Sequence, residues 1–187
     1  YIDVLGGRVH VGQRAALIGA GGIGFDVAEY LVHKGESSTL DPKRWMAEWG
    51  VDPTFETRGS LVKPQPEAPA REVWLLQRSA GKPGARLGKT SGWVHRATLK
   101  AKQVKMLGGV EYLGVNDSGL KIRIDGSEQL LPVDHVVVCA GQEPRRELQA
   151  ELLAAGITAH LIGGADVAAE LDAKRAIDQG SRLAAAL

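Results

Sequence analysis

Residues 15–28 read AALIGAGGIGFDVA and place a short apolar segment directly before a glycine-rich turn and a helical pattern. This is the strand–turn–helix order of a dinucleotide-binding site: the first glycine permits a tight turn, the second lets a pyrophosphate approach the backbone, and the third allows close helix–strand packing. The helix N-terminus adds free N–H groups and a positive dipole end. We therefore predict dinucleotide binding by Gly19, Gly21, Gly22, Ile23 and Gly24. The alternative is a purely structural turn.

The composition indicates a globular protein without general affinity for nucleic acid or membrane. The 187 residues are 44% hydrophobic and 24% charged, with a net charge of +1, which suits one domain of ordinary size with an appendage. Cys139 is the single cysteine, which excludes an internal disulfide and a cysteine-built metal cluster and suits a reducing, cytoplasmic location. We see no signal peptide and no apolar run near the roughly 20 residues of a membrane span. The chain begins at Tyr1, as expected of a processed product or a piece of a longer chain.

The order of apolar segments predicts an α/β fold. Short apolar strands are expected at 14–18, 72–76, 104–107 and 135–139, with crossover helices at 25–34 and 93–102 and a short helical turn at 1–5. Three further strands, at 110–115, 120–124 and 129–131, are separated by turn sequences and indicate an antiparallel meander. We predict a Rossmann-like, three-layer dinucleotide-binding domain with a meander crossover.

The segment 36–71 interrupts this plan with polar residues and five prolines, and we call it the excursion. Within it, Asp41 as N-cap, Pro42 at the first helical position and Gly50 as a stop predict one short helix over 43–49. Trp45 and Trp49 fall on the same face of that helix. Our interpretation is that they pack in a core; the alternative is a platform for a ligand.

The C-terminal region changes character. Residues 160–166 read as a short strand ending in glycines and an acid, and residues 168–187 read as one long helix. A lone strand and helix after a finished domain have no obvious partners within the chain.

The residues after the second strand indicate which dinucleotide is bound. An NAD site normally has an acidic residue about 20 residues after the glycines, but Glu36 falls on no expected strand. The excursion displaces the second strand, which ends at Leu76 without a carboxylate. Arg78, Ser79 and Lys82 instead offer donors suited to a ribose 2′-phosphate, so NADPH is favoured. The alternative is that these are solvated loop residues.

Several stretches together resemble the C-terminal part of bacterial NADPH-dependent 2,4-dienoyl-CoA reductases, and the likeness covers essentially the whole chain. They are residues 18–28, 76–78 (LQR), 82–84 (KPG), 87–96 (LGKTSGWVHR), 139–144 (CAGQEP), 161–166 (LIGGAD) and 169–177 (AELDAKRAI). The run that begins at Leu87 is far more specific than the glycine turn.

The resemblance implies a multi-cofactor, old-yellow-enzyme-like flavoprotein of fatty-acid β-oxidation. An N-terminal TIM barrel would hold FMN and an iron–sulfur cluster, and a C-terminal half would hold FAD and NADPH and pass hydride from NADPH to FAD. Residues 14–144 would be the NADPH-binding domain, residues 1–13 a lead-in from the FAD domain, and residues 145–187 a return to that domain with its last strand and helix. The FAD and barrel domains would be the partners. Alternatives are a related enoate or amine oxidoreductase, or a non-catalytic NADPH-binding module.

A few further residues receive a role or are set aside. The resemblance places Gly164 and Asp166 at the flavin, although Asp166 could instead cap the long helix, and Gly141 could approach a cofactor or form a simple turn. His33 and His95 have no carboxylate or thiol at an informative spacing, so we expect packing or exposure. Cys139 reads as a buried strand residue. We predict no catalytic and no metal-ligating residue in this chain.

Overall fold

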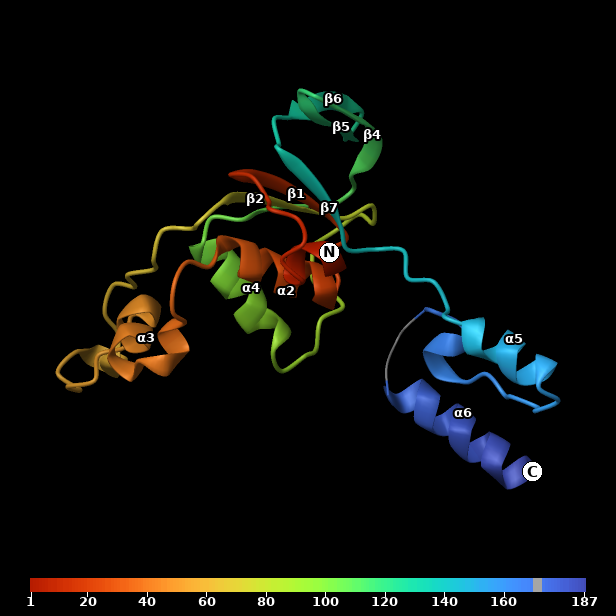
Figure 1. Cartoon of the computed structure of the whole chain (residues 1–187). Helices are drawn as coiled ribbons and strands as arrows, with labels where there is room; N and C mark the ends of the chain where they lie inside the picture. Colours follow the sequence, from red (N-terminus) through yellow and green to blue (C-terminus); the bar gives the residue numbers. More distant parts are fainter. Residues whose placement is uncertain (170–172) are drawn as a thin grey trace. The chain divides into compact units, whose positions relative to one another are not determined.

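The computed structural model describes residues 1–169 and 173–187, in two compact units, 1–140 and 141–187 (Figure 1). The first unit contains a parallel four-stranded sheet in the order β3-β2-β1-β7. Its strands are β1 (Arg14–Ile18), β2 (Glu72–Leu76), β3 (Lys105–Leu107) and β7 (His135–Val138). Because β1 lies between β2 and β7, the turn that follows it starts from the middle of the sheet.

Two further layers cover the faces of this sheet. The helices α2 (Gly22–Val32) and α4 (Gly92–Ala101) lie on one face, and the antiparallel strands β4 (Glu111–Asn116), β5 (Gly119–Ile124) and β6 (Ser127–Leu131) cover the other (Figure 1). The alternation of strand side chains produces this arrangement: Ala15 and Leu17 pack in the cluster on the helix side, while Ala16 packs on the meander side. The predicted three-layer α/β fold is confirmed.

The N-terminal residues belong to the same core. The short helix α1 (Ile2–Leu5) contributes the buried Val4, and Val11 follows it into the helix-side cluster. The predicted lead-in at 1–13 therefore packs on the dinucleotide fold. None of the helices in the described residues is long and apolar enough to cross a membrane.

The excursion holds η1 (Ser38–Leu40), α3 (Pro42–Trp49) and η2 (Arg58–Ser60). The helix α3 has the predicted caps, because Asp41 Oδ1 accepts hydrogen bonds from the N–H groups of Lys43 (3.0 Å) and Arg44 (3.3 Å), and Gly50 adopts φ +72°. The core interpretation of the two tryptophans is wrong, since no residue of α3 is buried. The helix is too short and too polar to extend either layer, and its aromatic face remains partly open.

The second unit departs from the sequence prediction. It holds α5 (Glu147–Ala154), which the sequence did not indicate, η3 (Gly163–Ala165) and α6 (Ala173–Ala186). The strand expected at 160–166 is absent, because a strand needs a hydrogen-bonding neighbour and none exists among the described residues of this unit. Of the helix predicted over 168–187, α6 covers Ala173–Ala186, residues 168 and 169 are not helical, and residues 170–172 lie outside the described part of the chain.

Candidate dinucleotide-binding site

The turn after β1 is fixed from both sides. Gly19 adopts φ +114°, and its N–H donates to the carbonyl oxygen of Leu76 at 2.9 Å. On the other side, a Cβ added to Gly19 would stand 2.8 Å from Cβ of Ala140, two residues after the end of β7. Glycine is therefore required here both by the backbone conformation and by the closeness of the neighbouring chain.

Gly24 lies against the same turn. A Cβ added at this position would stand 1.8 Å from the carbonyl oxygen of Gly19 and 3.2 Å from Cδ1 of Leu75. The first turn of α2 thus packs directly on the backbone of the glycine turn, which is the close helix–strand approach expected of the third glycine.

Gly21 and Gly22 present the opposite surroundings. Both are exposed, and a Cβ added to either would meet no atom within 4 Å. Gly21 is the N-cap of α2 and no side chain caps this helix, whose first turn also carries no acidic residue. The N-terminus of α2 therefore offers unsatisfied N–H groups, a positive dipole end and free space, an arrangement that fits a pyrophosphate.

The loop after β2 is held close to the end of β3. Gln77 Nε2 donates to the carbonyl oxygens of Ser79 (3.0 Å) and Gly81 (3.3 Å), and the N–H of Gly109 donates to the Ser79 carbonyl at 2.9 Å. Arg78 is exposed on this loop. Burial raises the pKa of Tyr112 on β4, and the positive charge of Arg78 partly offsets that rise, so the guanidinium lies near β4.

Lys82 has different neighbours from Arg78 and Ser79. It lines a pocket of about 450 Å³ together with Trp93, Arg96 and Lys100 of α4, and neither Arg78 nor Ser79 contributes to that lining. Sequence reasoning missed the two α4 cations. Their spacing from Trp93, three and seven residues along one helix, was the signal that could have found them.

The whole segment between β2 and β4 is cationic. No Asp or Glu occurs from residue 73 to residue 110, while eight Lys or Arg do. Lys102 and Lys105 pair with glutamates. In the part of the chain that the structure describes, the other six have no carboxylate within 4 Å. These six are Arg78, Lys82, Arg86, Lys89, Arg96 and Lys100. These cations without a carboxylate partner, on the segment between β2 and β4, favour an anionic ligand.

The two histidines and the cysteine have structural surroundings. His95 has the packing role that the sequence predicted, with a carboxylate partner that its spacing did not indicate: its Nδ1 lies 2.8 Å from Oε1 of Glu29 and joins α4 to α2. Nε2 of His33 lies 2.7 Å from the Gly35 carbonyl oxygen. Cys139 is buried, and burial raises the pKa of its thiol to about 11, so it remains an unreactive thiol at neutral pH.

The residues predicted at a flavin lie in the second unit. Gln179 holds Asp166 beside the glycines of η3, since its Nε2 donates to Asp166 Oδ2 (3.2 Å) and its Oε1 accepts from the N–H of Gly163 (2.6 Å). Asp166 does not cap a helix, because residues 167–169 directly after it are not helical, so that alternative is wrong. Gly164 lies within η3, and Gly141 adopts φ +82° with open space at its Cβ position.

Metal binding finds no support among the described residues, which hold no group of three or more His, Cys, Asp or Glu side chains arranged for a metal ion.

Comparisons with known proteins agree with this geometry. A family model described as pyridine nucleotide-disulphide oxidoreductase matches residues 5–174. The chain is 28% identical over 148 residues to a metal reductase of Desulforamulus reducens, which covers 78% of this chain and 21% of that protein.

Two solved structures share the fold. A 2-naphthoyl-CoA reductase in complex with 2-naphthoyl-CoA has a TM-score of 0.62 at 20% identity, covering 96% of this chain and 22% of that one. Histamine dehydrogenase from Rhizobium sp. 4-9 has a TM-score of 0.62 at 16% identity, covering 98% of this chain and 25% of that one. The chain therefore spans about a fifth to a quarter of the length of these proteins.

Proposed function

The chain belongs to the pyridine nucleotide-disulphide oxidoreductase family, and from that premise we propose that it binds NADPH and passes on its hydride within a larger flavoprotein reductase. The observation that carries the proposal is the contrast inside one turn. At Gly24 the backbone of the turn fills the Cβ position, whereas Gly21 and Gly22 face open space beside an uncapped helix N-terminus. Space for a phosphate and N–H groups aimed at it occur together only on that open side.

The cationic segment supports NADPH over NADH. The end of β2 carries no carboxylate that could accept hydrogen bonds from ribose hydroxyls, and Arg78 is exposed without a carboxylate partner among the described residues. An exposed guanidinium can donate two hydrogen bonds to a 2′-phosphate. Ser79 and Lys82 are the further donors that we assign to this phosphate.

The distinctive run at 87–96 supports the same site through packing. A Cβ on Gly92 would stand 2.7 Å from Cβ of Leu87, and one on Gly84 would stand 2.5 Å from the ring of Phe25. Arg96 donates to the Gly84 carbonyl oxygen at 2.8 Å. These contacts fix the loop after β2 on helix α2, and so hold the proposed phosphate donors in place.

We propose further that the hydride acceptor is FAD, with Asp166, Gly164 and Gly141 contributing to its site, and that the larger protein reduces 2,4-dienoyl-CoA in fatty-acid β-oxidation. FAD would supply a ring able to accept hydride from the nicotinamide. In the described residues Oδ1 of Asp166 accepts no hydrogen bond, so it is available to a flavin hydroxyl. The FAD and TIM-barrel domains, the latter with FMN and an iron–sulfur cluster, would be partners in the same protein. An enoate or amine oxidoreductase of the same architecture is the competing assignment.

Calorimetric titration of the chain with NADPH and with NADH tests the coenzyme assignment. NADPH should bind more tightly by about 1–3 kcal/mol, the size of charge-assisted hydrogen bonds. Arg78→Ala should remove most of this preference and leave NADH binding nearly unchanged, whereas Arg58→Ala, in the excursion, should change neither. Equal affinities of the unaltered chain for the two coenzymes would contradict the assignment.

The substrate assignment needs a separate assay. The chain alone should purify nearly colourless and show no NADPH-dependent reduction of 2,4-dienoyl-CoA, because hydride transfer needs an acceptor held in near contact with the nicotinamide. The full-length protein should reduce 2,4-dienoyl-CoA in preference to simple enoates and should not oxidise amines. Stoichiometric flavin in the isolated chain, or turnover by it, would overturn the proposed division of labour.

A further inference from the structure

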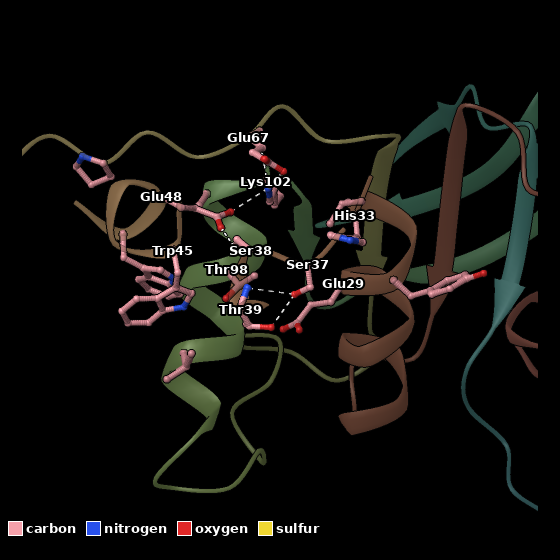
Figure 2. A pocket seen from close by; sticks show the side chains of 16 residues that line it. Glu29, His33, Ser37, Ser38, Thr39, Trp45, Glu48, Glu67, Thr98 and Lys102 are labelled. Atoms are coloured by element: carbon pink, nitrogen blue, oxygen red, sulfur yellow. Dashed lines mark hydrogen bonds and ion pairs between the residues drawn. The ribbon is translucent and has the colours of Figure 1, made fainter. Parts of the chain in front are cut away.

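A pocket of about 560 Å³ separates the excursion from the helices α2 and α4 (Figure 2). None of the residues assigned to the dinucleotide lines it. It lies beside the helix layer. Without the excursion, this side of the crossover helices α2 and α4 would face water. The excursion thus creates a second concave surface that NADPH binding leaves unused.

One wall of this pocket is aromatic. Trp45 and Trp49 stand one helical turn apart on α3, with ring centroids 6.1 Å apart and ring planes tilted by 37°. Trp45 is 40% exposed although it is large and apolar. The indole N–H groups of both donate no hydrogen bond within the described residues. An exposed aromatic pair at the side of a cavity is a surface that a flat or apolar ligand could cover.

The pocket is also acidic. Three carboxylates, from Glu29, Glu48 and Glu67, line it against the single ammonium of Lys102. The negative charge of Glu48 is compensated within the protein, because Lys102 Nζ lies 3.0 Å from its Oε1 and Ser38 Oγ donates to its Oε2 at 2.6 Å. Burial alone would raise the pKa of Glu48, but these hydrogen bonds keep it below the ordinary value. Arg44 Nε likewise donates to Glu67 at 2.7 Å.

Glu29 differs from these two. Its Oε1 lies 2.8 Å from the ring nitrogen of His95, while its Oε2 accepts no hydrogen bond from the described residues. Figure 2 shows the Glu29 carboxylate facing the hydroxyl groups of Ser37 and Thr39 across the pocket from Trp45. The pocket therefore combines an aromatic wall on one side with a carboxylate oxygen that can accept a hydrogen bond on the other.

We propose that this pocket binds a small organic monocation, a protonated amine carried on an aromatic or apolar body. The ammonium group would donate to Oε2 of Glu29, and the body would lie against Trp45 and Trp49, whose ring faces attract positive charge. An anion would meet uncompensated carboxylate charge and no unpaired cation, since the ammonium of Lys102 is already bound to Glu48 and to the Glu67 carbonyl oxygen. The site is independent of the proposed NADPH function.

A charge series of matched probes tests the proposal on the chain itself. Phenethylamine, 2-phenylethanol and 3-phenylpropanoate share a phenyl ring on a short chain and differ in charge at its end. We expect saturable binding of the amine by calorimetry, at least tenfold weaker binding of the alcohol, and no binding of the carboxylate. Equal affinity for amine and alcohol, binding of the carboxylate, or no saturable binding of the amine at millimolar concentrations would each overturn the proposal.

Variants locate the bound probe. Glu29→Gln should lower the affinity for the amine at least tenfold and leave the affinity for the alcohol unchanged. Glu56→Gln, in an exposed loop of the excursion, should change neither affinity. Trp45→Leu should weaken both probes, and Trp93→Leu, an exposed tryptophan outside this pocket, should weaken neither. A cooperative urea unfolding transition, measured on each variant, reports folding of the domain without reference to NADPH. Unaltered amine binding in a folded Glu29→Gln variant would contradict the assignment.

Discussion

The glycine turn at 19–24 and the excursion at 36–71 both redirect the chain beside helix α2, but different forces hold them. In the turn, backbone lies on backbone: the Cβ position of Gly24 is filled by the carbonyl oxygen of Gly19. In the excursion, side chains make the contacts: Lys102 of the helix layer pairs with Glu48 of α3, and Asp52 accepts hydrogen bonds within its own loop. Backbone contact leaves no room for adjustment, whereas side chains can move. In the turn, a substitution should therefore either abolish stability or NADPH binding or leave it nearly unchanged. In the excursion, substitutions should lower the local stability by graded amounts.

The largest effect is expected at Gly24. In Gly24→Ala the added methyl group would meet a backbone oxygen at 1.8 Å, so α2 must shift away from the sheet. Overpacking of this kind costs about 3 kcal/mol or more when backbone has to move. Urea unfolding should show this loss, while Gly22→Ala, whose Cβ would meet nothing within 4 Å, should unfold within about 1 kcal/mol of the unaltered chain.

Gly21 sharpens the same contrast within one turn. Gly21→Val places a branched side chain in the open space beside the helix N-terminus, where the pyrophosphate is proposed to lie. We expect NADPH binding to be lost with the cooperative unfolding transition retained, because the backbone there has φ −86° and suits any residue. Normal NADPH binding by a folded Gly21→Val chain would show that the turn has only a structural role.

The same contrast explains what the sequence could predict. The helix α3 was found because its signals, Asp41, Pro42 and Gly50, are local and act within one turn. The layers were found because short apolar strands, helical patterns and a turn-rich meander follow one another in an order that the sequence itself shows. Both features could be predicted because the residues that determine them are adjacent in the sequence.

Features built by distant side chains were not found. His95 and Glu29 are 66 positions apart, and only the packing of α4 beside α2 brings them together. The grouping of Lys82 with Arg96 and Lys100 depends in the same way on where α4 lies. The strand expected at 160–166 has the local pattern but no neighbour among the described residues of its unit, and local pattern alone cannot supply one.

In the excursion, an intermediate effect is expected from Lys102. Its side chain is 9% exposed and its ammonium lies between Glu48 and Glu67. Lys102→Met keeps the apolar stem but leaves Glu48 without its cation, at a cost of about 2 kcal/mol, the size of a hydrogen bond to a charged group. Amide exchange should speed up in α3 before the sheet opens. Lys121→Met, which breaks an exposed pair with Glu128 on the meander, is the matched control and should change little.

The smallest and most local effect is expected from Asp52, the buried carboxylate that closes the loop after α3. It accepts hydrogen bonds from the N–H groups of Thr54 (2.9 Å) and Thr57 (2.8 Å) and from both threonine hydroxyls (2.6 and 2.8 Å). These donors hold the pKa of Asp52 well below its ordinary value. Because the charged form is favoured in the folded loop, its stabilisation is complete above the ordinary aspartate pKa, about 3.9, and is lost as the pH falls below it. Amide exchange at Ser60 and its neighbours should therefore be steady from about pH 8 to pH 5, once corrected for intrinsic rates, and accelerate below about pH 4. In Asp52→Asn the loop should already be open at neutral pH and lack this acid transition. A transition of the same size in Asp52→Asn would assign it to another carboxylate.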